Sequence, residues 1–343
     1  MTGSAPSVFI GSDNSMQPTS IAIVTPVLND WESFSQLVRH IAGLEALRGA
    51  SVTIVAVDDG STEIAAPPRA MLTDCVEQIH IIKLKANQGH QRAIVLGLAY
   101  VEKELSPDRI VVMDSDGEDR PEVIPALLAE SAQNPGAIIV AQRKKRSEGL
   151  IFRAGYQVYK FAFRYLTGKP ISFGNFSLIP ANRLPNVIYN SGIWNNFAAT
   201  LLKSRLPIRF VPTERGLRYH GSSKMNVTSL MIHGFSAISV FTDVVIGRII
   251  SLLTLAVAAT AVGISVVVYL KFFGGVFVPG YATTVILFMV TVLALCLFNG
   301  FLLILSLLAT RESSSAVPSD LLDTLIQDVS VLERVKVETV EMR

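Results

Sequence analysis

Residues 109–122 read RIVVMDSDGEDRPE, a short apolar run that passes directly into a cluster of carboxylates. The run Ile110–Met113 is typical of a buried strand. Asp114, Asp116 and Glu118 follow at alternate positions, and alternate side chains of an extended segment share a face. Three hard oxygen donors on one face suit Mg²⁺ or Mn²⁺. An acidic loop that caps the next helix is the alternative explanation.

The sequence around this segment predicts an α/β fold. Short apolar runs alternate with helical patterns, which indicates a mostly parallel sheet covered by helices on both faces. The predicted strands are Ile21–Val27, Val52–Val57, Ile79–Leu84, Ile110–Met113 and Ala137–Ala141. The predicted helices between them are Glu32–Leu47, Gln91–Lys103 and Pro121–Gln133.

Polar side chains follow each of the first four predicted strands, and open α/β sheets bind ligands at the carboxyl ends of their strands. The polar segments are Thr25–Asn29, Asp58–Ser61, Asn87–His90 and Asp114–Asp119. Turn chemistry explains any one of them, because Asp, Asn and Gly suit turns. Four in succession predict a shared ligand site. The sequence contains no Walker-type phosphate loop, dinucleotide-binding glycine motif or nucleophile elbow that would compete with this site.

Composition and hydropathy point to a membrane. Half of the 343 residues are hydrophobic and only 17% are charged. Two runs without a charge, Ile249–Leu270 and Thr283–Ala309, each exceed the roughly 20 residues needed to cross a bilayer. A short loop joins them, so we expect a transmembrane hairpin; buried helices of a soluble protein are the alternative.

The distribution of charge predicts the orientation of this hairpin. Arg248 and Arg311 bracket it, whereas its turn holds only Lys271. The positive-inside rule then places the large N-terminal part in the cytoplasm, in a multi-pass protein of the cell (inner) membrane. Cys75 and Cys296 lie far apart in the sequence, which argues against a disulfide framework or a zinc site and suits a reducing compartment.

These patterns divide the chain into five parts. The expected parts are a disordered N-terminus (1–19), a cytoplasmic catalytic domain (20–225), an interface helix (226–247), a two-helix membrane region (248–310, with spans 249–270 and 283–309) and a cytoplasmic tail (311–343). The basic aromatic segment Leu150–Leu166 is either a second interface helix or an ordinary core helix. The tail has a weak helical pattern and carries no chemistry that we can identify.

Taken together, these segments resemble glycosyltransferase family 2, with its GT-A (Rossmann-like) fold. The resemblance covers about residues 20–309 and is closest to the polyprenyl-phosphate branch, the dolichol-phosphate mannosyltransferases and bacterial undecaprenyl-phosphate glucosyltransferases. It implies a nucleotide-sugar site that contains Pro26, Asp58, Asp59, Asn87, Gly89 and Asp114. It implies a site for Mg²⁺ or Mn²⁺ made by the D-x-D residues Asp114 and Asp116 with Glu118.

The segment Arg218–Lys224 resembles the family's R-x-x-G-x-S-K motif, which meets donor or acceptor phosphates. Arginine offers a planar fork to phosphate and lysine a point charge. The catalytic residues implied are Asp116, Arg218 and Lys224, and the residues expected near the acceptor phosphate are Arg143, Arg153 and Ser223. A solvated basic loop beside anionic lipid is the alternative explanation of these cations.

Asn175 departs from the family pattern, because many relatives carry an acidic residue at this position. An amide cannot remove a proton from an acceptor hydroxyl, whereas a lipid phosphate is already an anionic nucleophile and needs no base. Asn175 therefore favours a phosphate acceptor, although Asp119 or Glu214 could supply a base if the fold brings either one close.

The sequence thus predicts an inverting glycosyltransferase that moves a sugar from a UDP- or GDP-sugar to a polyprenyl phosphate. Membrane lipids are expected partners, nucleic acid is not, and a homo-oligomer is left open. A membrane glycosyltransferase that acts on a sugar hydroxyl or glycolipid is the alternative enzyme. A non-catalytic scaffold is disfavoured by the intact D-x-D, and a transporter is disfavoured because two uncharged spans offer no substrate path.

Overall fold

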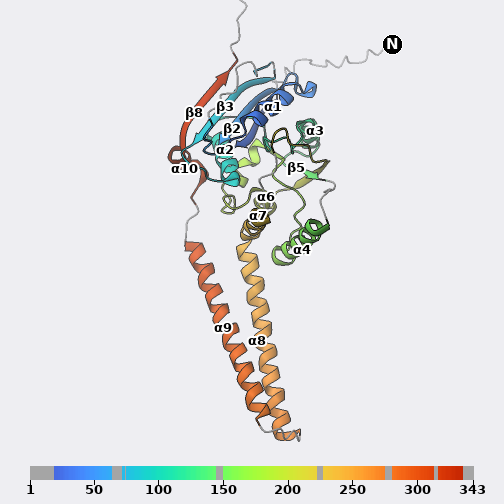
Figure 1. Cartoon of the computed structure of the whole chain (residues 1–343), viewed down its shortest axis with the longest axis vertical. Coiled ribbons are helices and arrows are strands. Elements are labelled where there is room, and N and C mark those ends of the chain that lie inside the picture. Colours follow the sequence, from blue (N-terminus) through green and yellow to red (C-terminus); the bar gives the residue numbers. More distant parts are fainter. Residues whose placement is uncertain are drawn as a thin grey trace, which may run out of the picture.

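The computed structural model describes residues 19–63, 72–73, 75–143, 150–221, 227–274, 280–312 and 316–334. A sheet flanked by helices forms one end of the molecule, and a long helical hairpin projects from it (Figure 1). The strands are β1 (Ser20–Val27), β2 (Ser51–Asp58), β3 (Val76–Leu84), β4 (Arg109–Val112), β5 (Ile138–Arg143), β6 (Ser177–Pro180), β7 (Ile208–Thr213) and β8 (Ile326–Glu333). The expected disorder of the N-terminus concerns residues almost all outside the described ranges.

The strands form one mixed sheet in the order β7-β5-β6-β4-β1-β2-β3-β8. β1 pairs in parallel with β2 and β4, and β2 pairs in parallel with β3. β6 is antiparallel to both β4 and β5, and β8 is antiparallel to β3. The carboxyl ends of the first four strands therefore lie side by side along one end of the sheet, as the sequence predicts.

Helices cover both faces of this sheet, which confirms the predicted α/β architecture. The helices are α1 (Trp31–Ala42), α2 (His90–Glu104), α3 (Ile124–Gln133), α4 (Leu150–Thr167), α5 (Leu184–Ile188), α6 (Phe197–Lys203), α7 (Val227–Ser239), α8 (Thr242–Phe273), α9 (Tyr281–Glu312) and α10 (Pro318–Leu325). One buried cluster joins the sheet to α2, α5 and α6, and another joins it to α1 and α3.

Successive side chains of β1 point to opposite faces of the sheet and therefore belong to different clusters. Ile21 and Ile23 pack with α1, whereas Ala22 and Val24 pack with α2. Helix α2 lies very close to the sheet at Gly97, where an added Cβ would be 2.6 Å from Cγ1 of Val24. This close contact fixes the start of α2 at the edge where the polar segments meet.

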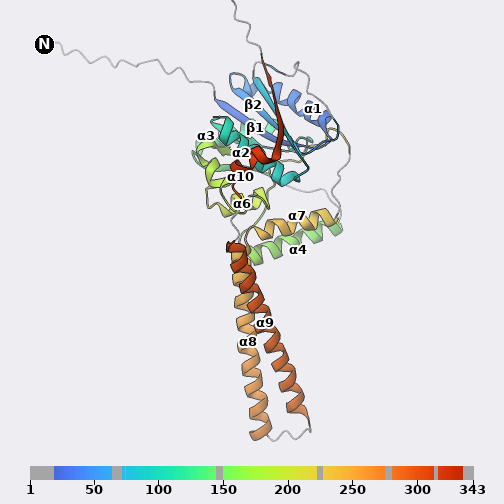
Figure 2. The same ribbon diagram turned by 90° about the vertical axis from the view of Figure 1, so that its left-hand side faces the viewer.

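Helices α8 and α9 form the expected hairpin (Figures 1 and 2). The segments Thr242–Phe273 and Tyr281–Ser306 have hydropathies of 2.3 and 2.6, and their most apolar stretches are not buried inside the molecule. Gly263 allows close packing between the two helices, because a Cβ there would lie 2.7 Å from Cε of Met289. By length and composition, both helices are suited to cross a membrane.

The region before the hairpin differs from the single interface helix expected over residues 226–247. Helix α7 ends at Ser239, and residues from Thr242 onward already belong to α8. Figure 2 shows α7 beside α4, with both helices lying across the end of the hairpin. Gly234 lets them approach, because a Cβ there would lie 2.9 Å from Cε2 of Tyr159.

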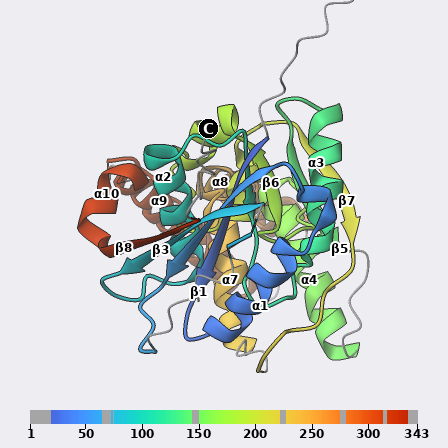
Figure 3. The ribbon, with the colours of Figure 1, turned by 90° about the horizontal axis from the view of Figure 1, so that it is seen from above.

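The C-terminal tail also differs from its expected helical pattern. In the described part of the tail, α9 ends at Glu312, Pro318–Leu325 forms α10, and the next eight residues form β8. Figure 3 shows β8 beside β3 at one edge of the sheet, with β7 beside β5 at the other. Ile326 and Val329 pack against the core cluster that contains α2. The chain therefore returns from the hairpin to complete the sheet that begins near its N-terminus.

Removal of residues 326–343 is expected to destabilise the α/β domain, because β3 loses its edge partner and apolar side chains lose a cover. We expect the melting temperature to fall by about 5 °C or more, since roughly 1 kcal/mol corresponds to 2–4 °C in a domain of this size. Removal of residues 335–343 keeps β8 and serves as the control. Equal melting temperatures for the two truncated chains would contradict a structural role of β8.

Candidate functional site

The polar strand ends meet beside β1, where the strand order changes direction. The chain runs from β1 outward through β2 and β3, and then returns to place β4 on the other side of β1. Two hydrogen bonds join these ends: Oγ of Ser115 donates to the carbonyl oxygen of Pro26 at 3.0 Å, and the amide of Asp59 donates to that of Val27 at 2.9 Å. Ligands of open α/β sheets bind at such a switch point.

Asp58 and Asp59 are buried at the end of β2, with exposures of 5% and 3%. The two oxygens of Asp59 accept the backbone amides of Gln88 and Gly89 at 2.6 and 3.0 Å. Asp59 therefore positions the Asn87–Gly89 turn that begins α2. Oδ1 of Asp58 accepts the amide of Ser61 at 2.8 Å, and no described residue bonds to its Oδ2.

Gly60 and Gly89 suit this tight arrangement, because both have φ near +80 to +90°, where side chains are disfavoured. A Cβ on Gly60 would lie 2.9 Å from the backbone nitrogen of Asn87. The predicted residues Asn87 and Gly89 thus contribute their backbone to the shape of the site.

Asp114 and Asp116 follow β4 and lie close enough for the charge of one to affect the pKa of the other. Oδ1 of Asp116 accepts the amide of Glu118 at 2.9 Å, and Oδ2 lies 3.1 Å from Nη1 of Arg218. Burial raises the pKa of Asp116, and the charge of Asp114 raises it further. Burial alone would also raise the pKa of Asp114, but His90, Arg143 and Asn175 together outweigh this effect, so that pKa is lowered.

The segment 215–219 packs directly on the acidic loop and explains how Arg218 reaches it. The amide of Gly216 donates to the carbonyl oxygen of Glu118, and the amide of Tyr219 donates to that of Asp116, each at 2.9 Å. Gly216 has to be glycine, because a Cβ there would overlap the carbonyl oxygen of Gly117. Two backbone hydrogen bonds therefore hold a basic segment against carboxylates that lie about 100 residues earlier.

The carboxylate of Glu118 is paired with two arginines. Its Oε1 contacts Arg215, and its Oε2 lies 3.8 Å from Nη1 of Arg143. Among the described residues, no group of three His, Cys, Asp or Glu side chains is arranged to hold a metal ion. The role of Glu118 as a third metal ligand therefore stays a prediction from the sequence.

Arg143 pairs with the buried carboxylate of Asp119, whose Oδ1 is 3.0 Å from Nη2 of the arginine. Oδ2 of Asp119 accepts the backbone amide of Asp114 at 3.1 Å. Burial and the charge of Asp114 raise the pKa of Asp119 to about 7, although Arg143 opposes the shift. Arg143 thus lies at the site, where it holds the loop together.

A chain of hydrogen bonds reaches Asp114 from the other side. The amide of Phe197 donates to Oε1 of Gln91 at 2.8 Å, and Nε2 of Gln91 donates to Oδ1 of Asn175 at 3.3 Å. Nδ2 of Asn175 then points at Nε2 of His90, 3.0 Å away. The backbone donor fixes the orientation of both amides, so the Nδ2 side of the Asn175 amide faces His90 and Asp114.

The same ring nitrogen of His90 lies 3.2 Å from Oδ1 of Asp114. Despite this contact, Oδ1 of Asp114 is buried and has no aligned hydrogen bond from the described residues. Nε of Arg218 is likewise buried without a partner in the described part of the chain. Buried polar atoms are normally satisfied, so Oδ1 of Asp114 is a candidate contact for a cation and Nε of Arg218 is a candidate contact for an anion.

These observations test the fit of the predicted cation. Asp114 and Asp116 offer carboxylate oxygens, the donors that Mg²⁺ and Mn²⁺ prefer, and Oδ1 of Asp114 accepts no hydrogen bond from the described residues. The site fits such an ion with two protein carboxylates, because Mg²⁺ usually keeps waters and phosphate oxygens in its shell.

Some of the predicted site residues, or their side chains, lie outside the part of the chain that the structure describes. Ser223 and Lys224 fall outside the described residues, as does the side chain of Arg153. Sequence reasoning gave no role to His90, although the residue closes one of the polar segments. It also gave no site role to Arg215. The position of Arg215, three residues before Arg218 in the same basic segment, could have indicated such a role.

Helix α7 comes close to this site through His233. Burial lowers the pKa of His233, the charge of His90 lowers it further, and that of Asp114 opposes the shift. The adjacent residues Met231, Ile232 and Phe235 are exposed by 56%, 61% and 64%. One side of α7 thus approaches the acidic cluster while another presents apolar side chains to the surroundings.

Asp59→Asn is expected to loosen the Asn87–Gly89 turn, because an amide replaces one acceptor oxygen and leaves one buried backbone N–H without a partner. The cost is about 1–3 kcal/mol in the free energy of unfolding, measured by chemical denaturation. Asp58→Asn is the matched control, since its remaining oxygen still accepts the amide of Ser61. An equal cost for both variants would contradict the positioning role of Asp59.

Part of the chain is similar in sequence to curated bacterial transferases. An undecaprenyl-phosphate 4-deoxy-4-formamido-L-arabinose transferase from Enterobacter sp. (strain 638) is 33% identical over 137 residues, 39% of each chain. The transferase of the same name from Salmonella paratyphi A is 28% identical over 151 residues, 43% of this chain and 44% of that one. The alignments thus span less than half the length of these relatives.

A crystal structure of glucosyl-3-phosphoglycerate synthase from Mycobacterium tuberculosis, in complex with Mn²⁺, UDP-glucose and phosphoglyceric acid, is 15% identical. It aligns with a TM-score of 0.48 over 66% of this chain and 80% of that one. The family model described as Glycosyl transferase family 2 matches residues 22–192, which hold β1 to β6 and the acidic loop. Residues 22–192 of this chain therefore form a glycosyl transferase family 2 domain.

Proposed function

We propose that this chain transfers a sugar, with inversion, from a UDP- or GDP-sugar to a polyprenyl phosphate at the cytoplasmic face of a membrane. The observation that carries the proposal is the pair of buried, unsatisfied atoms in one cluster, Oδ1 of Asp114 and Nε of Arg218. A carboxylate oxygen attracts a cation, and a guanidinium N–H attracts an anion. A metal–diphosphate group offers both charges together.

Asp114 and Asp116 would hold Mg²⁺ or Mn²⁺ in this account. The bound ion supplies positive charge that offsets the charge of the departing diphosphate. Glu118 keeps Arg215 and Arg218 in place, since its Oε1 lies near both. The carboxylate thereby positions the cations.

Arg218 binds a phosphate oxygen through its unsatisfied Nε while Nη1 remains paired with Asp116. Oδ2 of Asp58 accepts a hydrogen bond from the nucleoside, and the nearby backbone of Pro26 lines the same pocket. Asp59 acts on the nucleotide only through the turn that it holds. Lys224 and Ser223 remain proposed phosphate contacts from the sequence motif.

An anionic oxygen of the lipid phosphate attacks the anomeric carbon of the sugar. The new C–O bond forms as the bond to the diphosphate breaks, and the nucleoside diphosphate leaves with the electron pair. Attack from the opposite side inverts the configuration. No proton has to be removed, which agrees with the presence of an amide, which is not a base, at Asn175 beside His90.

The position of the site near a membrane supports a lipid acceptor. The charges of His90 and Asp114 affect the pKa of His233 on helix α7, and α7 directly precedes the first apolar helix of the hairpin. The curated relatives are named as undecaprenyl-phosphate transferases. Arg248 and Arg311 bracket the hairpin and favour a cytoplasmic site.

The test is transfer of radiolabelled sugar to undecaprenyl phosphate by the purified full-length chain, with UDP- and GDP-sugars and with Mg²⁺ or Mn²⁺. Asp116→Asn is expected to lower kcat on the order of 100-fold or more, because it removes several kcal/mol of charge stabilisation. Asp328→Asn changes an exposed carboxylate on β8 and is the control. A chelator should abolish turnover by the unmodified chain.

Mass spectrometry of the product distinguishes the two acceptor classes. A sugar linked through the lipid phosphate supports the proposal. A sugar attached to a hydroxyl would show the alternative enzyme, and the absence of product with every donor would contradict transferase activity.

A further inference from the structure

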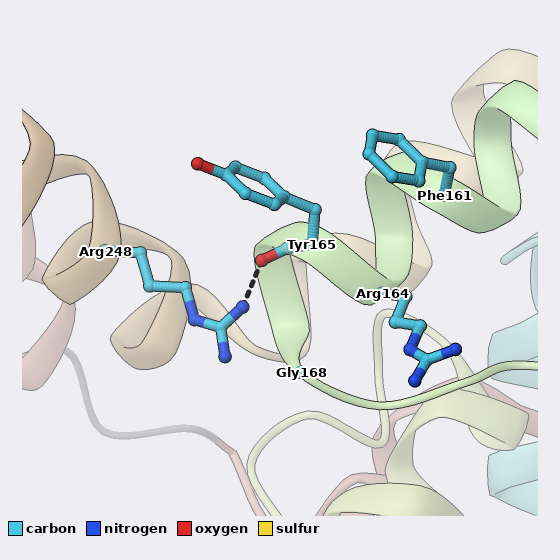
Figure 4. Close-up of a pocket in the computed structure, with 5 residues that line it drawn as sticks. All are labelled: Phe161, Arg164, Tyr165, Gly168 and Arg248. Carbon is cyan, nitrogen blue, oxygen red and sulfur yellow. Dashed lines mark hydrogen bonds between the residues drawn. The ribbon is translucent and has the colours of Figure 1, made fainter.

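A pocket of about 320 Å³ lies where the C-terminal end of α4 meets the start of α8. Phe161, Arg164, Tyr165 and Gly168 line it from α4 and its end, and Arg248 lines it from α8. Figure 4 shows the guanidinium groups of both arginines on either side of Gly168. The lining therefore combines two positive charges with two aromatic rings and contains no acidic residue.

The backbone holds Arg248 in this position. Nη1 of Arg248 donates to the carbonyl oxygen of Tyr165 in the last turn of α4 (Figure 4). Gly168 has φ +77°, and a Cβ there would lie 2.7 Å from Nη2 of Arg248. The absence of a side chain at Gly168 therefore leaves room for the guanidinium group at the end of the helix.

Neither arginine is neutralised within the described part of the chain. No described carboxylate lies within 4.0 Å of Arg164 or Arg248, whereas Arg143, Arg215 and Arg218 all pair with acidic groups. A pocket with two unneutralised guanidinium groups favours an anion, and their planar forks suit phosphate oxygens.

The pocket lies at the expected level of lipid headgroups. Arg248 is the last charged residue before the uncharged run Ile249–Leu270. Helix α8 has 32 residues and is about 48 Å long at about 1.5 Å per residue, whereas a bilayer core is about 30 Å thick. The first turns of α8 therefore extend beyond the core on the side of the α/β domain.

Helix α4 also carries exposed apolar side chains, which suit the same headgroup level of the membrane. Val158, Phe161 and Tyr165 are exposed by 68%, 73% and 53%, and the rings of Phe161 and Tyr165 stack with centroids 6.3 Å apart. Figure 2 shows α4 lying across the end of the hairpin. Aromatic side chains with arginines beside them are typical of the membrane interface.

We propose that this pocket binds the phosphate of an anionic phospholipid of the surrounding bilayer. Arg164 and Arg248 hold the phosphate oxygens, and Phe161 and Tyr165 rest on the upper part of the acyl chains. Because Arg248 also binds the end of α4, the lipid ties α4 to the first turn of the membrane hairpin. The site is a lipid contact separate from the acidic cluster that would bind the donor.

Native mass spectrometry tests this on the full-length chain in non-ionic detergent, with phosphatidylglycerol and phosphatidylcholine of identical acyl chains. The unmodified chain is expected to retain phosphatidylglycerol preferentially. Arg164→Gln/Arg248→Gln is expected to lower that retention about tenfold or more, since two cations near the headgroup are lost. Arg39→Gln/Arg48→Gln removes two exposed arginines of the α/β domain and is expected to retain the lipid normally.

Loss of Arg248 could unfold the end of α4, because Arg248 binds the carbonyl oxygen of Tyr165 there. The single variant Arg164→Gln avoids this problem, because the side chain of Arg164 caps no helix. It should lower retention of phosphatidylglycerol with an unchanged melting temperature. Equal retention by Arg164→Gln and the unmodified chain would overturn the proposal. Thermal stabilisation by inorganic phosphate as large as that by phosphatidylglycerol would also overturn it, because the pocket would then not be a lipid site.

Discussion

The parallel pairing of β1 with both β2 and β4 is the constraint on which the site depends. It brings the loops after three strands to one edge of the sheet, although their acidic residues lie up to about 90 positions apart. The bond from Ser115 to the carbonyl oxygen of Pro26 joins two of these loops directly. Burial of several carboxylates at one point follows from this topology and has to be compensated.

Arginines and backbone amides provide that compensation. Arg143 pairs with Asp119, Arg215 with Glu118, and Arg218 with Asp116, so most of the carboxylates that follow β4 have a fixed partner. Breaking such a pair leaves an uncompensated buried charge. Oδ1 of Asp114 faces His90 at 3.2 Å and has no arginine or backbone amide as a partner among the described residues, and we propose that the cation binds there.

The sequence was sufficient to predict the elements whose signal is local. Continuous apolar runs identified the central strands, and long uncharged runs identified α8 and α9, because burial or lipid on all sides selects such composition. The polar segments at the strand ends located Asp58, Asp114 and Asp116, since parallel strands bring their ends together.

Features that depend on distant contacts could not be predicted in this way. Strand β8 pairs with β3 about 250 residues away, and only about every third of its residues is partly buried, so it has no strong pattern of its own. The engagement of Glu118 by Arg215 depends on Gly216 packing against Gly117, which two separate segments determine together. The break between α7 and α8 likewise falls within a mostly apolar stretch, where the sequence pattern did not indicate it.

Anomalous diffraction at the manganese edge, from crystals grown with Mn²⁺ and a nucleoside diphosphate, tests the central claim most directly. We expect a single strong peak of anomalous density within bonding distance of Asp114, with the diphosphate between the ion and Arg218. A peak away from the ends of β1 and β4, or a nucleotide bound elsewhere in a correctly folded protein, would contradict it.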